Sequence, residues 1–322
     1  MTIKKIVRKV KSKYNIIKLE KNYLKKYEKY AFNPNETSYN SYEQYEAVIT
    51  RLYHTVEKCL AFNNFTPGRG KKNVKLLINV MKNYILDGYN KDSYFYNCAY
   101  SALVEYVNIN EKNGCKDDEI KSILTGLEGN DNKQGGIIKY QPYSVDDIQK
   151  LNYEKFIKSR HSIRHFTEKK VEMDSVINAL NLAQFTPSAC NRQGWKTLIV
   201  DQKDIIKKVL NNQNGNEGFG NEFDKLILVL GDLKFFNNDR ELFQVFIDSG
   251  MYAQSILNSL YYYGIGSVPL SASLSVEQDN NIRKILDIKE NEIIILFIGI
   301  GSFPKNCITT KSSRRIPNTR IV

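Results

Sequence analysis

Ser159-Arg160-His161-Ser162-Ile163-Arg164-His165-Phe166 holds two of the chain's three histidines and two arginines that flank a serine. A guanidinium group is a planar set of donors that matches phosphate oxygens, and it stays charged at any working pH. In one helical turn Arg160 and Arg164 would share a face, where they repel each other unless an anion lies between them. For such a cluster alone, a solvated basic surface turn is the favoured interpretation.

A second polar segment changes this interpretation. A helix is expected at residues 174–184, and Pro187 ends it. The segment that follows is Pro187-Ser188-Ala189-Cys190-Asn191-Arg192-Gln193-Gly194-Trp195. Together the two segments predict the two sides of a site for a planar cofactor that carries a phosphate.

Length and composition indicate a globular protein. The chain has 322 residues, enough for one large domain or two. Apolar residues make up 42% and charged residues 25%, which is sufficient for a real core. The net charge of +12 is uneven, because residues 1–30 hold eleven basic residues and two acidic ones. The rest of the chain is close to balanced, so binding of nucleic acid is not indicated.

The cysteines favour a reducing compartment. The chain has five, none of them paired at the spacing of a metal site or redox motif. We therefore expect reduced thiols and a cytoplasmic location. No apolar run is as long as a membrane span, and the basic start lacks the features of a signal peptide. His54 and Glu57 are three residues apart, but without a third ligand we expect a structural histidine and no metal site.

Residues 1–30 have the pattern of a basic amphipathic helix. Apolar residues recur at helical spacing among the lysines. They are Ile3, Ile6, Val7, Val10, Tyr14 and Ile17. Such a helix could make a peripheral contact with an anionic membrane or a partner protein. The alternative that we favour is a helix whose apolar stripe packs on its own protein.

The first half of the chain shows almost no strand-like alternation, so we expect it to be all-helical. Further helices are expected at residues 41–62, 74–86, 94–107 and 116–127. Residues 66–72 form a turn rich in glycine and cations, without the spacing of a P-loop. Residues 129–136 are the best linker candidate. The expected division is therefore a helical region at 1–128, a linker at 129–154 and a second domain at 155–322.

The second half alternates between strands and helices. Residues 137–145 are expected to be extended, and a helix begins near Ser144, with Asp147 three residues on. Strands are expected at 196–200, 226–230, 267–270 and 292–300, and helices at 242–263 and 276–286. Residues 226–230 are entirely apolar, so this strand should be buried on both faces. The pattern indicates an α/β or α+β domain, and the dinucleotide fingerprint is absent.

The motifs of residues 155–322 resemble, in order and spacing, those of the FMN-dependent nitroreductase family. Residues 160–166 resemble the family's opening motif, and residues 187–195 resemble its second. Asp248-Ser249-Gly250, Gly264-Ile265-Gly266-Ser267, Gly299-Ile300-Gly301 and Arg315-Ile316-Pro317 resemble later landmarks. The resemblance covers about half of the chain. It implies an α+β fold with a mixed central sheet flanked by helices, preceded here by an all-helical region.

The resemblance also implies which residues bind FMN. Arg160, His161 and Ser162 would hold the phosphate and ribityl chain. Arg164 would lie near the N1–O2 edge of the flavin, where a cation stabilises the negative charge of the reduced ring. Asn191 would bind the pyrimidine edge, and Pro187, Ser188 and Ala189 would come from the other subunit of a homodimer. The remaining members of the implied set are Gln193, Pro269, Leu270, Ser271, Gly301, Arg314 and Arg315.

Three positions depart from the family pattern. Ser313 stands where the family often has a lysine, and Arg314 could substitute for it. Gly194 replaces a proline, and Ser271 stands where some members have an acid. These departures concern the substrate face more than flavin binding.

The implied activity is a ping-pong transfer of two electrons. NAD(P)H would reduce a tightly bound FMN, and a small-molecule electron acceptor would then replace it. The cofactor carries this chemistry, so we name no catalytic residue. One alternative is a flavin-dependent biosynthetic tailoring enzyme whose helical half recognises a larger substrate. Another is a flavin-fold protein whose basic helical half binds a partner or membrane and whose redox activity is secondary.

Overall fold

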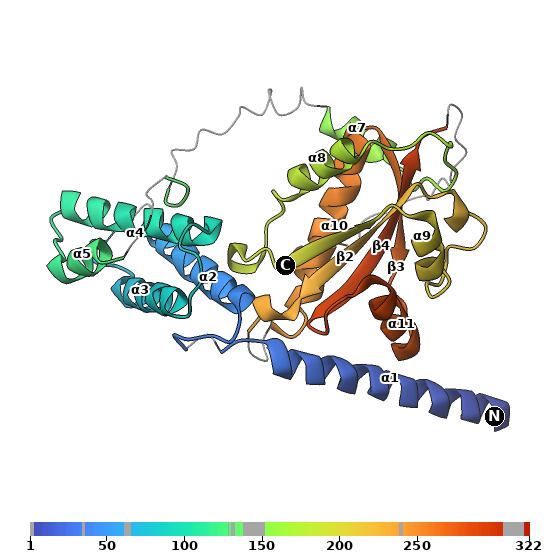
Figure 1. Cartoon of the computed structure of the whole chain (residues 1–322), viewed down its shortest axis with the longest axis horizontal. Coiled ribbons are helices and arrows are strands. Elements are labelled where there is room, and N and C mark those ends of the chain that lie inside the picture. Colours follow the sequence, from blue (N-terminus) through green and yellow to red (C-terminus); the bar gives the residue numbers. More distant parts are fainter. Residues whose placement is uncertain are drawn as a thin grey trace.

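The computed structural model describes residues 3–33, 36–60, 66–127, 129, 133–137, 152–237, 241–304 and 319–322. Within these ranges the chain forms a helical region and an α+β domain built on a four-stranded sheet (Figure 1). The expected α+β class with a helical first half is therefore confirmed. None of the described helices combines the length and the apolar character that a membrane span requires.

The sheet has the strand order β1-β2-β4-β3. Its strands are β1 (Trp195–Val200), β2 (Lys225–Asp232), β3 (Ile265–Ser271) and β4 (Glu292–Ser302). All three pairings between these strands are antiparallel, so the described sheet is antiparallel and not the mixed sheet that the resemblance implied. The parallel pairing in the described part of the chain is an isolated bridge between Phe32 and Asn237. Each strand covers the range expected from its apolar run, extended at one or both ends.

Helices cover both faces of the sheet (Figure 1). One face packs on α8 (Met173–Ala183) and α10 (Gln244–Tyr262). The other face packs on α9 (Lys203–Leu210) and α11 (Val276–Leu286). Successive side chains of a strand point to opposite faces, and every residue of β2 is buried, which confirms the expected strand with two covered faces. The sequence interpretation missed α9, although Ile205, Ile206, Val209 and Leu210 have helical spacing.

Five helices lie within the described part of residues 1–128. They are α1 (Ile3–Tyr30), α2 (Tyr42–Leu60), α3 (Lys71–Leu86), α4 (Tyr94–Lys112) and α5 (Asp118–Thr125). Their core is rich in aromatic rings, with Tyr45, Tyr84 and Tyr96 fully buried. Tyr84 stacks on Tyr96 with ring centroids 5.6 Å apart and meets Tyr45 edge-on at the same separation. The expected helices of this region are thus confirmed.

The helical region and the α+β domain share one core. Phe235 and Phe236, from the short helix η3 (Leu233–Phe235) and its C-cap, belong to the same buried cluster as the tyrosines of α2 and α3. The backbone N–H of Phe32 donates to the carbonyl of Phe236 at 3.1 Å, and the hydroxyl of Tyr27 donates to the carbonyl of Asn237 at 2.9 Å. The two halves are therefore joined by buried contacts as well as by the connecting chain.

Several expectations lie outside the described residues. They include most of the expected linker, the extended segment at 137–145, the cap formed by Ser144 and Asp147, and the cofactor-binding residues Arg314 and Arg315. The description resumes at Asn152, which precedes α7 (Tyr153–Ser159). This short helix leads directly into the basic segment.

Candidate functional site

The basic segment at residues 160–166 is extended, so Arg160 and Arg164 do not form a helical turn. α7 ends at Ser159, and Arg160 already has the backbone angles of a strand (φ −69°, ψ 122°). The N–H of Ile163 donates to the carbonyl of Ser267 in β3 at 2.9 Å. The N–H of Thr167 donates to the carbonyl of Ser302 in β4 at 3.1 Å. The segment therefore runs as a strap across one end of the β3–β4 pair.

The strap is fixed by its apolar side chains, which leaves the polar ones at the surface. Ile163 is buried, whereas Arg160, His161, Ser162 and Arg164 are all half-buried. Half-buried cations and a hydroxyl on an immobilised backbone are suited to bind an anion, because little entropy is lost on ordering them. The strap thus carries the three residues predicted to hold the phosphate and ribityl chain, together with Arg164, which is predicted to lie at the ring edge.

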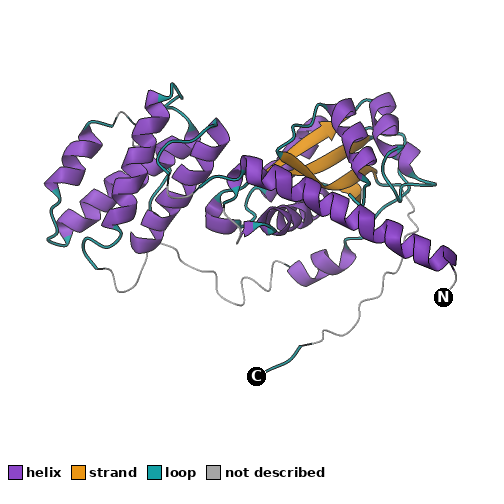
Figure 2. Ribbon diagram, turned by 90° about the horizontal axis from the view of Figure 1, so that it is seen from below, coloured by secondary structure: helices purple, strands orange, loops and turns teal. Residues whose placement is uncertain are grey.

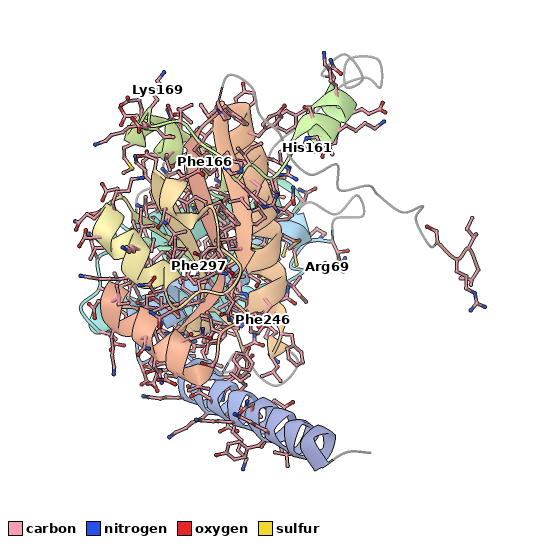
Figure 3. The ribbon with its side chains drawn as sticks, turned by 90° about the vertical axis from the view of Figure 1, so that its right-hand side faces the viewer. Arg69, His161, Phe166, Lys169, Phe246 and Phe297 are labelled. Carbon is pink, nitrogen blue, oxygen red and sulfur yellow. The ribbon has the colours of Figure 1, made fainter. Side chains whose placement is uncertain are left out.

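The side chains around the strap define its surroundings. The guanidinium of Arg164 lies 5.8 Å from the ring centre of Phe219. The ring of His161 contacts the carbonyl of Ser159 through Nδ1 at 2.9 Å. The hydroxyl of Tyr261, near the end of α10, donates to Oγ of Ser159 at 2.7 Å. Figure 3 shows His161 beside α7, at the end of the domain opposite α1.

Glu222 fixes the C-terminal part of the strap, and the sequence analysis did not identify it. Its carboxylate contacts Nδ1 of His165 at 2.9 Å and accepts from the N–H of Phe166 at 2.9 Å. Burial alone would raise the pKa of Glu222, but these hydrogen bonds outweigh it and the pKa is lowered. Glu222 lies 56 residues beyond Phe166 in a glycine-containing segment, so no local pattern pointed to it.

Gly301 has a packing role beside the strap. A Cβ at this position would lie 2.6 Å from Cγ of Phe166, closer than carbon atoms can approach. The glycine therefore makes room for the Phe166 ring, which also meets Phe223 edge-on with centroids 5.9 Å apart. Figure 3 shows Phe166 near the end of the sheet that the strap crosses.

The predicted flavin-edge residues lie on β3, an outer strand of the sheet. Pro269 and Ser271 are exposed and Leu270 is buried, as the alternation of a strand requires. Proline is tolerated on an edge strand because one side of the strand needs no N–H donor. The carbonyl of Ser271 accepts from Nε2 of Gln213 at 3.0 Å.

The second polar segment has an unusual backbone. Cys190, Asn191 and Gln193 all have φ between 52° and 55°, in the left-handed region that side chains disfavour. Hydrogen bonds hold this conformation: the N–H of Gln193 donates to Oγ of Ser188 at 2.9 Å, and the N–H of Ala189 donates to Asp248 at 3.1 Å. Backbone strain that is held in this way is typical of functional loops.

Two carboxylates support this segment, the half-buried Glu241 and the buried Asp248. Glu241 receives both terminal nitrogens of Arg192, at 2.7 and 2.8 Å, and the Arg192 side chain is fully buried. Asp248 in α10 accepts from Ala189 and from Gln244, and burial raises its pKa. The sequence analysis identified Asp248 as a family landmark but gave it no function. Its position shows that it anchors the 187–193 segment.

The helical region contacts the second polar segment. α2 packs against η1 (Ala189–Asn191), and the hydroxyl of Tyr53 lies close to the side chain of Asn191. Tyr53 is buried, and burial raises its pKa above the usual tyrosine range. This contact was not foreseen, because nothing in the sequence of α2 connects it to residues far along the chain.

Within one chain the two polar segments lie at opposite ends of the sheet. Residues 187–194 lead into Trp195 at the start of β1, and Trp195 is opposite Gly231 in β2. Asp232, which follows Gly231, is opposite Glu292 at the start of β4. The strap crosses the other end, where Ile265 is opposite Ser302. A single chain therefore does not bring the strap and residues 187–189 together.

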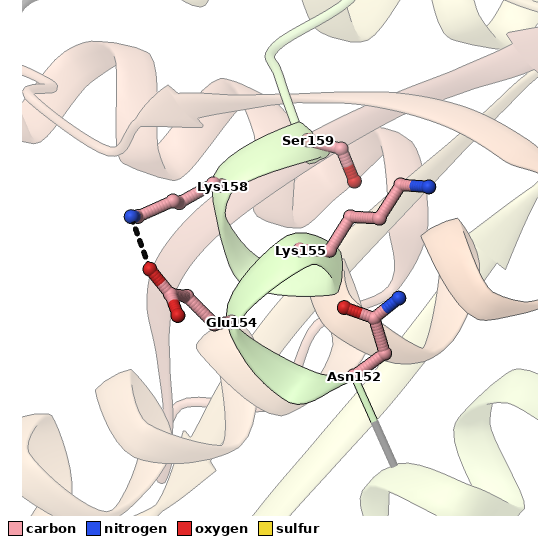
Figure 4. A pocket seen from close by; sticks show the side chains of 5 residues that line it. All are labelled: Asn152, Glu154, Lys155, Lys158 and Ser159. Carbon is pink, nitrogen blue, oxygen red and sulfur yellow. Dashed lines mark hydrogen bonds and ion pairs between the residues drawn. The ribbon is translucent and has the colours of Figure 1, made fainter. Parts of the chain in front are cut away.

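A surface cavity of about 460 Å³ adjoins the strap. It is lined by residues of α7 and its N-cap: Asn152, Glu154, Lys155, Lys158 and Ser159. Figure 4 shows Glu154 and Lys158 joined by an ion pair on one side of the helix, with Lys155 and Ser159 on the other. The cavity is open and its lining is exposed, so it extends the basic surface beside Arg160 and does not form an enclosed site.

No metal site is found among the described residues, since no group of three histidine, cysteine, aspartate or glutamate side chains there could hold an ion. His54 contacts Glu57 through Nδ1 at 3.3 Å, as a structural pair on one helix would. The site within the described ranges is therefore built from cations, hydroxyls, amides and backbone groups.

Comparison with known proteins identifies the class of the α+β domain. Residues 157–216 and 210–302 match the model of the nitroreductase family. A curated protein of Archaeoglobus fulgidus named "Putative NADH dehydrogenase/NAD(P)H nitroreductase" is 26% identical over 152 residues, which are 47% of this chain and 85% of that protein. Residues 157–302, which make up most of the α+β domain, therefore match the nitroreductase family, and the helical region precedes them.

Solved structures align with the same part of the chain. The FMN-dependent nitroreductase of Clostridium difficile R20291 aligns with 51% of this chain and 98% of its own, with 21% identity and a TM-score of 0.43. The nitroreductase family protein of Streptococcus pneumoniae TIGR4 aligns with 51% of this chain and 96% of its own, with 20% identity and a TM-score of 0.44.

Proposed function

We propose that this protein is an FMN-dependent oxidoreductase of the nitroreductase type, which transfers two electrons from NAD(P)H to a small-molecule acceptor. The observation that carries the proposal is the strap at residues 160–167. It holds two arginines, two histidines and a serine at the end of β3 and β4, within a domain that matches the nitroreductase family. The named relative links the same domain to NAD(P)H, and one aligned structure links it to FMN.

The residues present fit FMN. A guanidinium group and a hydroxyl are donors that a phosphate ester needs, and the strap supplies them in Arg160 and Ser162. A second guanidinium, that of Arg164, is available for the ring edge. The exposed edge of β3 at Pro269–Ser271 leaves backbone groups available for the polar atoms of a planar ring. Arg314 and Arg315 lie outside the described residues, and we keep them in the proposed phosphate site.

We further propose that the site is completed in a homodimer. Phe243, the N-cap of α10, is followed at intervals of four residues by Ile247 and Met251 within the helix, and the three side chains are 64%, 53% and 39% exposed. A stripe of large apolar side chains on the outer face of a helix favours burial against a second chain. In an antiparallel pair of chains, residues 187–189 of one chain would approach the strap of the other. The two segments, which lie at opposite ends of the sheet within one chain, would then form one site.

In this proposal the protein holds and orients the cofactor and does not act as an acid or base. Bound FMN would supply the two-electron chemistry. Arg164 would stabilise negative charge on the ring edge, Asn191 and Gln193 would bind polar ring atoms, and Arg160, His161 and Ser162 would fix the phosphate. Gly301 would act indirectly, by admitting the Phe166 ring that fixes the strap.

The contact between α2 and the second polar segment favours one alternative function. Because α2 packs against η1 and Tyr53 lies close to Asn191, the helical region shapes the segment predicted to bind the pyrimidine edge of the flavin. This is what a flavin-dependent biosynthetic tailoring enzyme with a larger substrate would require. A cytoplasmic location, and a peripheral membrane or protein contact by residues 1–30, also remain proposals.

Anaerobic titration tests the proposed function. Purified protein should be yellow, release FMN on denaturation, and lose its absorbance near the visible flavin maximum when NADH or NADPH is added. Reoxidation by a panel of quinones, nitroaromatics and larger substrates would then separate a general reductase from a tailoring enzyme. Bound FMN that neither nicotinamide reduces would contradict the proposed activity while leaving the cofactor site intact.

A further inference from the structure

A cavity of about 190 Å³ lies where α1 crosses the α+β domain. Its walls come from α1, the start of α10, β4, and the chain from the end of β3 into α11. Figure 2 shows α1 running across the α+β domain, and Figure 3 shows Phe246 close to α1 and far from His161. The cavity is therefore distinct from the proposed phosphate site at the strap.

Most of the cavity wall is apolar. Tyr23 and Phe246 form one side, with ring centroids 5.4 Å apart, and the hydroxyl of Tyr23 donates to the carbonyl of Leu242. Leu19, Leu274 and Ile293 contribute aliphatic surface. A ring or a short hydrocarbon chain that binds here would move from water to an apolar surface, and this transfer is favourable.

One end of the cavity carries an excess of positive charge. Lys26 lines it and is only 8% exposed. The Lys26 ammonium lies 3.9 Å from Asp279, and Asp279 already receives Nε of Arg283 at 2.6 Å. Glu290, the next carboxylate, is bound by Lys29 at 2.5 Å and by Tyr30 at 2.6 Å. Two cations thus share one carboxylate at the buried end.

The direction of the Lys26 pKa shift agrees with this excess of positive charge. Burial lowers the pKa of Lys26 and the charge of Arg283 lowers it further, whereas Asp279 and Glu290 raise it only in part. A buried ammonium whose compensation is incomplete gains free energy from an additional anion. Two cationic donors and an apolar wall are complementary to an amphiphilic carboxylate.

We propose that this cavity binds a small organic anion with an apolar body, and that its carboxylate lies between Lys26 and Arg283. The ligand class follows from a confined volume with an apolar wall and a cationic end. α1 lies outside the residues that match the nitroreductase family, whereas the opposite wall of the cavity lies inside them, so the site forms only where the helical extension packs on that domain. It does not depend on the proposed flavin chemistry.

Calorimetry with hexanoate and its neutral analogue hexanamide tests the proposal on the full chain, with whatever cofactor it carries. Hexanoate should bind saturably at millimolar concentration or below, and hexanamide at least tenfold more weakly. Lys26→Met should reduce hexanoate affinity to the level of hexanamide. Lys25→Met, on the exposed side of the same helix, should leave both affinities unchanged. Hexanoate that binds no better than hexanamide, or equally well to Lys26→Met, would overturn the proposal.

A second variant guards against a general effect of removing a charge. Leu274→Trp fills the cavity and keeps Lys26, so it should abolish binding of both compounds. Urea unfolding of each variant establishes that the fold is intact. Full hexanoate binding by folded Leu274→Trp would place the ligand elsewhere and refute the site. The bound-flavin spectrum should be the same in all variants, so failure of this proposal is distinguishable from failure of the flavin assignment.

Discussion

At the scale of single residues, the contact between the two halves of the chain contains a carboxylate in an unfavourable position. Glu46 on α2 is largely buried, and burial raises its pKa to about 7, with further increases from Glu43 and Asp232 and a partial decrease from Lys196. Lys196 is itself bound to Asp232 at 2.7 Å and Glu292 at 3.2 Å, so its charge is already shared. Ionisation of Glu46 therefore lowers the stability of the folded protein.

The free energy of unfolding should consequently fall as pH rises past the ordinary glutamate pKa of 4.5 and through about 7. The folded state holds the proton more tightly than the unfolded state, so deprotonation favours unfolding. Glu46→Gln should remove this dependence and raise the free energy of unfolding at pH 8 by roughly 1–3 kcal/mol. Urea unfolding at pH 5 and pH 8 measures the effect.

Glu43→Gln is the matched control on the same helix. Burial alone would raise the pKa of Glu43, but backbone and Lys234 hydrogen bonds lower it, and Lys234 lies 3.1 Å away. Loss of the Glu43 carboxylate in Glu43→Gln should therefore destabilise the protein at pH 8 by about 1 kcal/mol. If both substitutions destabilise equally at pH 8, the position assigned to Glu46 is wrong.

Gly194 shows how a departure from the family pattern is explained by packing. A Cβ at this position would lie 2.6 Å from Cβ of Phe235, in the core shared by the two halves. Gly194→Ala should therefore cost about 1–3 kcal/mol of unfolding free energy in urea denaturation. Gly126→Ala, whose Cβ would meet its neighbours at ordinary distances, should be close to neutral. A neutral Gly194→Ala would contradict the close packing of Gly194 against η3.

At the scale of elements, the sequence predicted the helices and strands better than the contacts among them. Residues 226–230 and 292–300 were identifiable as strands because their apolar runs are long. α9 was missed because it is short and its apolar residues alternate with charged ones. The strap was located by its arginines, but its extended path depends on Ser267, Ser302 and Glu222. Such partners are distant in sequence, so local patterns could not identify them.

Truncation of Phe166 should release the strap from the sheet. The ring occupies the space left by Gly301 and Gly266 and meets Phe223. Phe166→Ala should cost about 2 kcal/mol, less than for a fully buried ring, and should speed amide exchange at Ile163 and Thr167. Tyr153→Ala removes a ring that is 66% exposed and should leave these amides unchanged. Unaltered exchange in Phe166→Ala would show that the strap is held by other contacts.

At the scale of the whole molecule, the exposed stripe on α10 predicts assembly. Ile247→Asp places a charge in the centre of the stripe and should convert a dimer into monomers in sedimentation velocity, with loss of bound FMN. Leu86→Asp changes a residue of the helical region that is 81% exposed, and it should preserve both the dimer and its flavin. A monomeric unsubstituted protein that retains FMN would refute the shared site.

The most direct test of the central claim is the FMN content per chain of purified Arg160→Ala, measured by absorbance and mass after denaturation. The strap is proposed to hold the phosphate, so this variant should fold normally and contain less than a tenth of the FMN of the unsubstituted protein. Lys169→Ala, an exposed cation just beyond the strap, should keep the full amount. Full FMN occupancy in Arg160→Ala, or an unsubstituted protein that never contains flavin, would contradict the account.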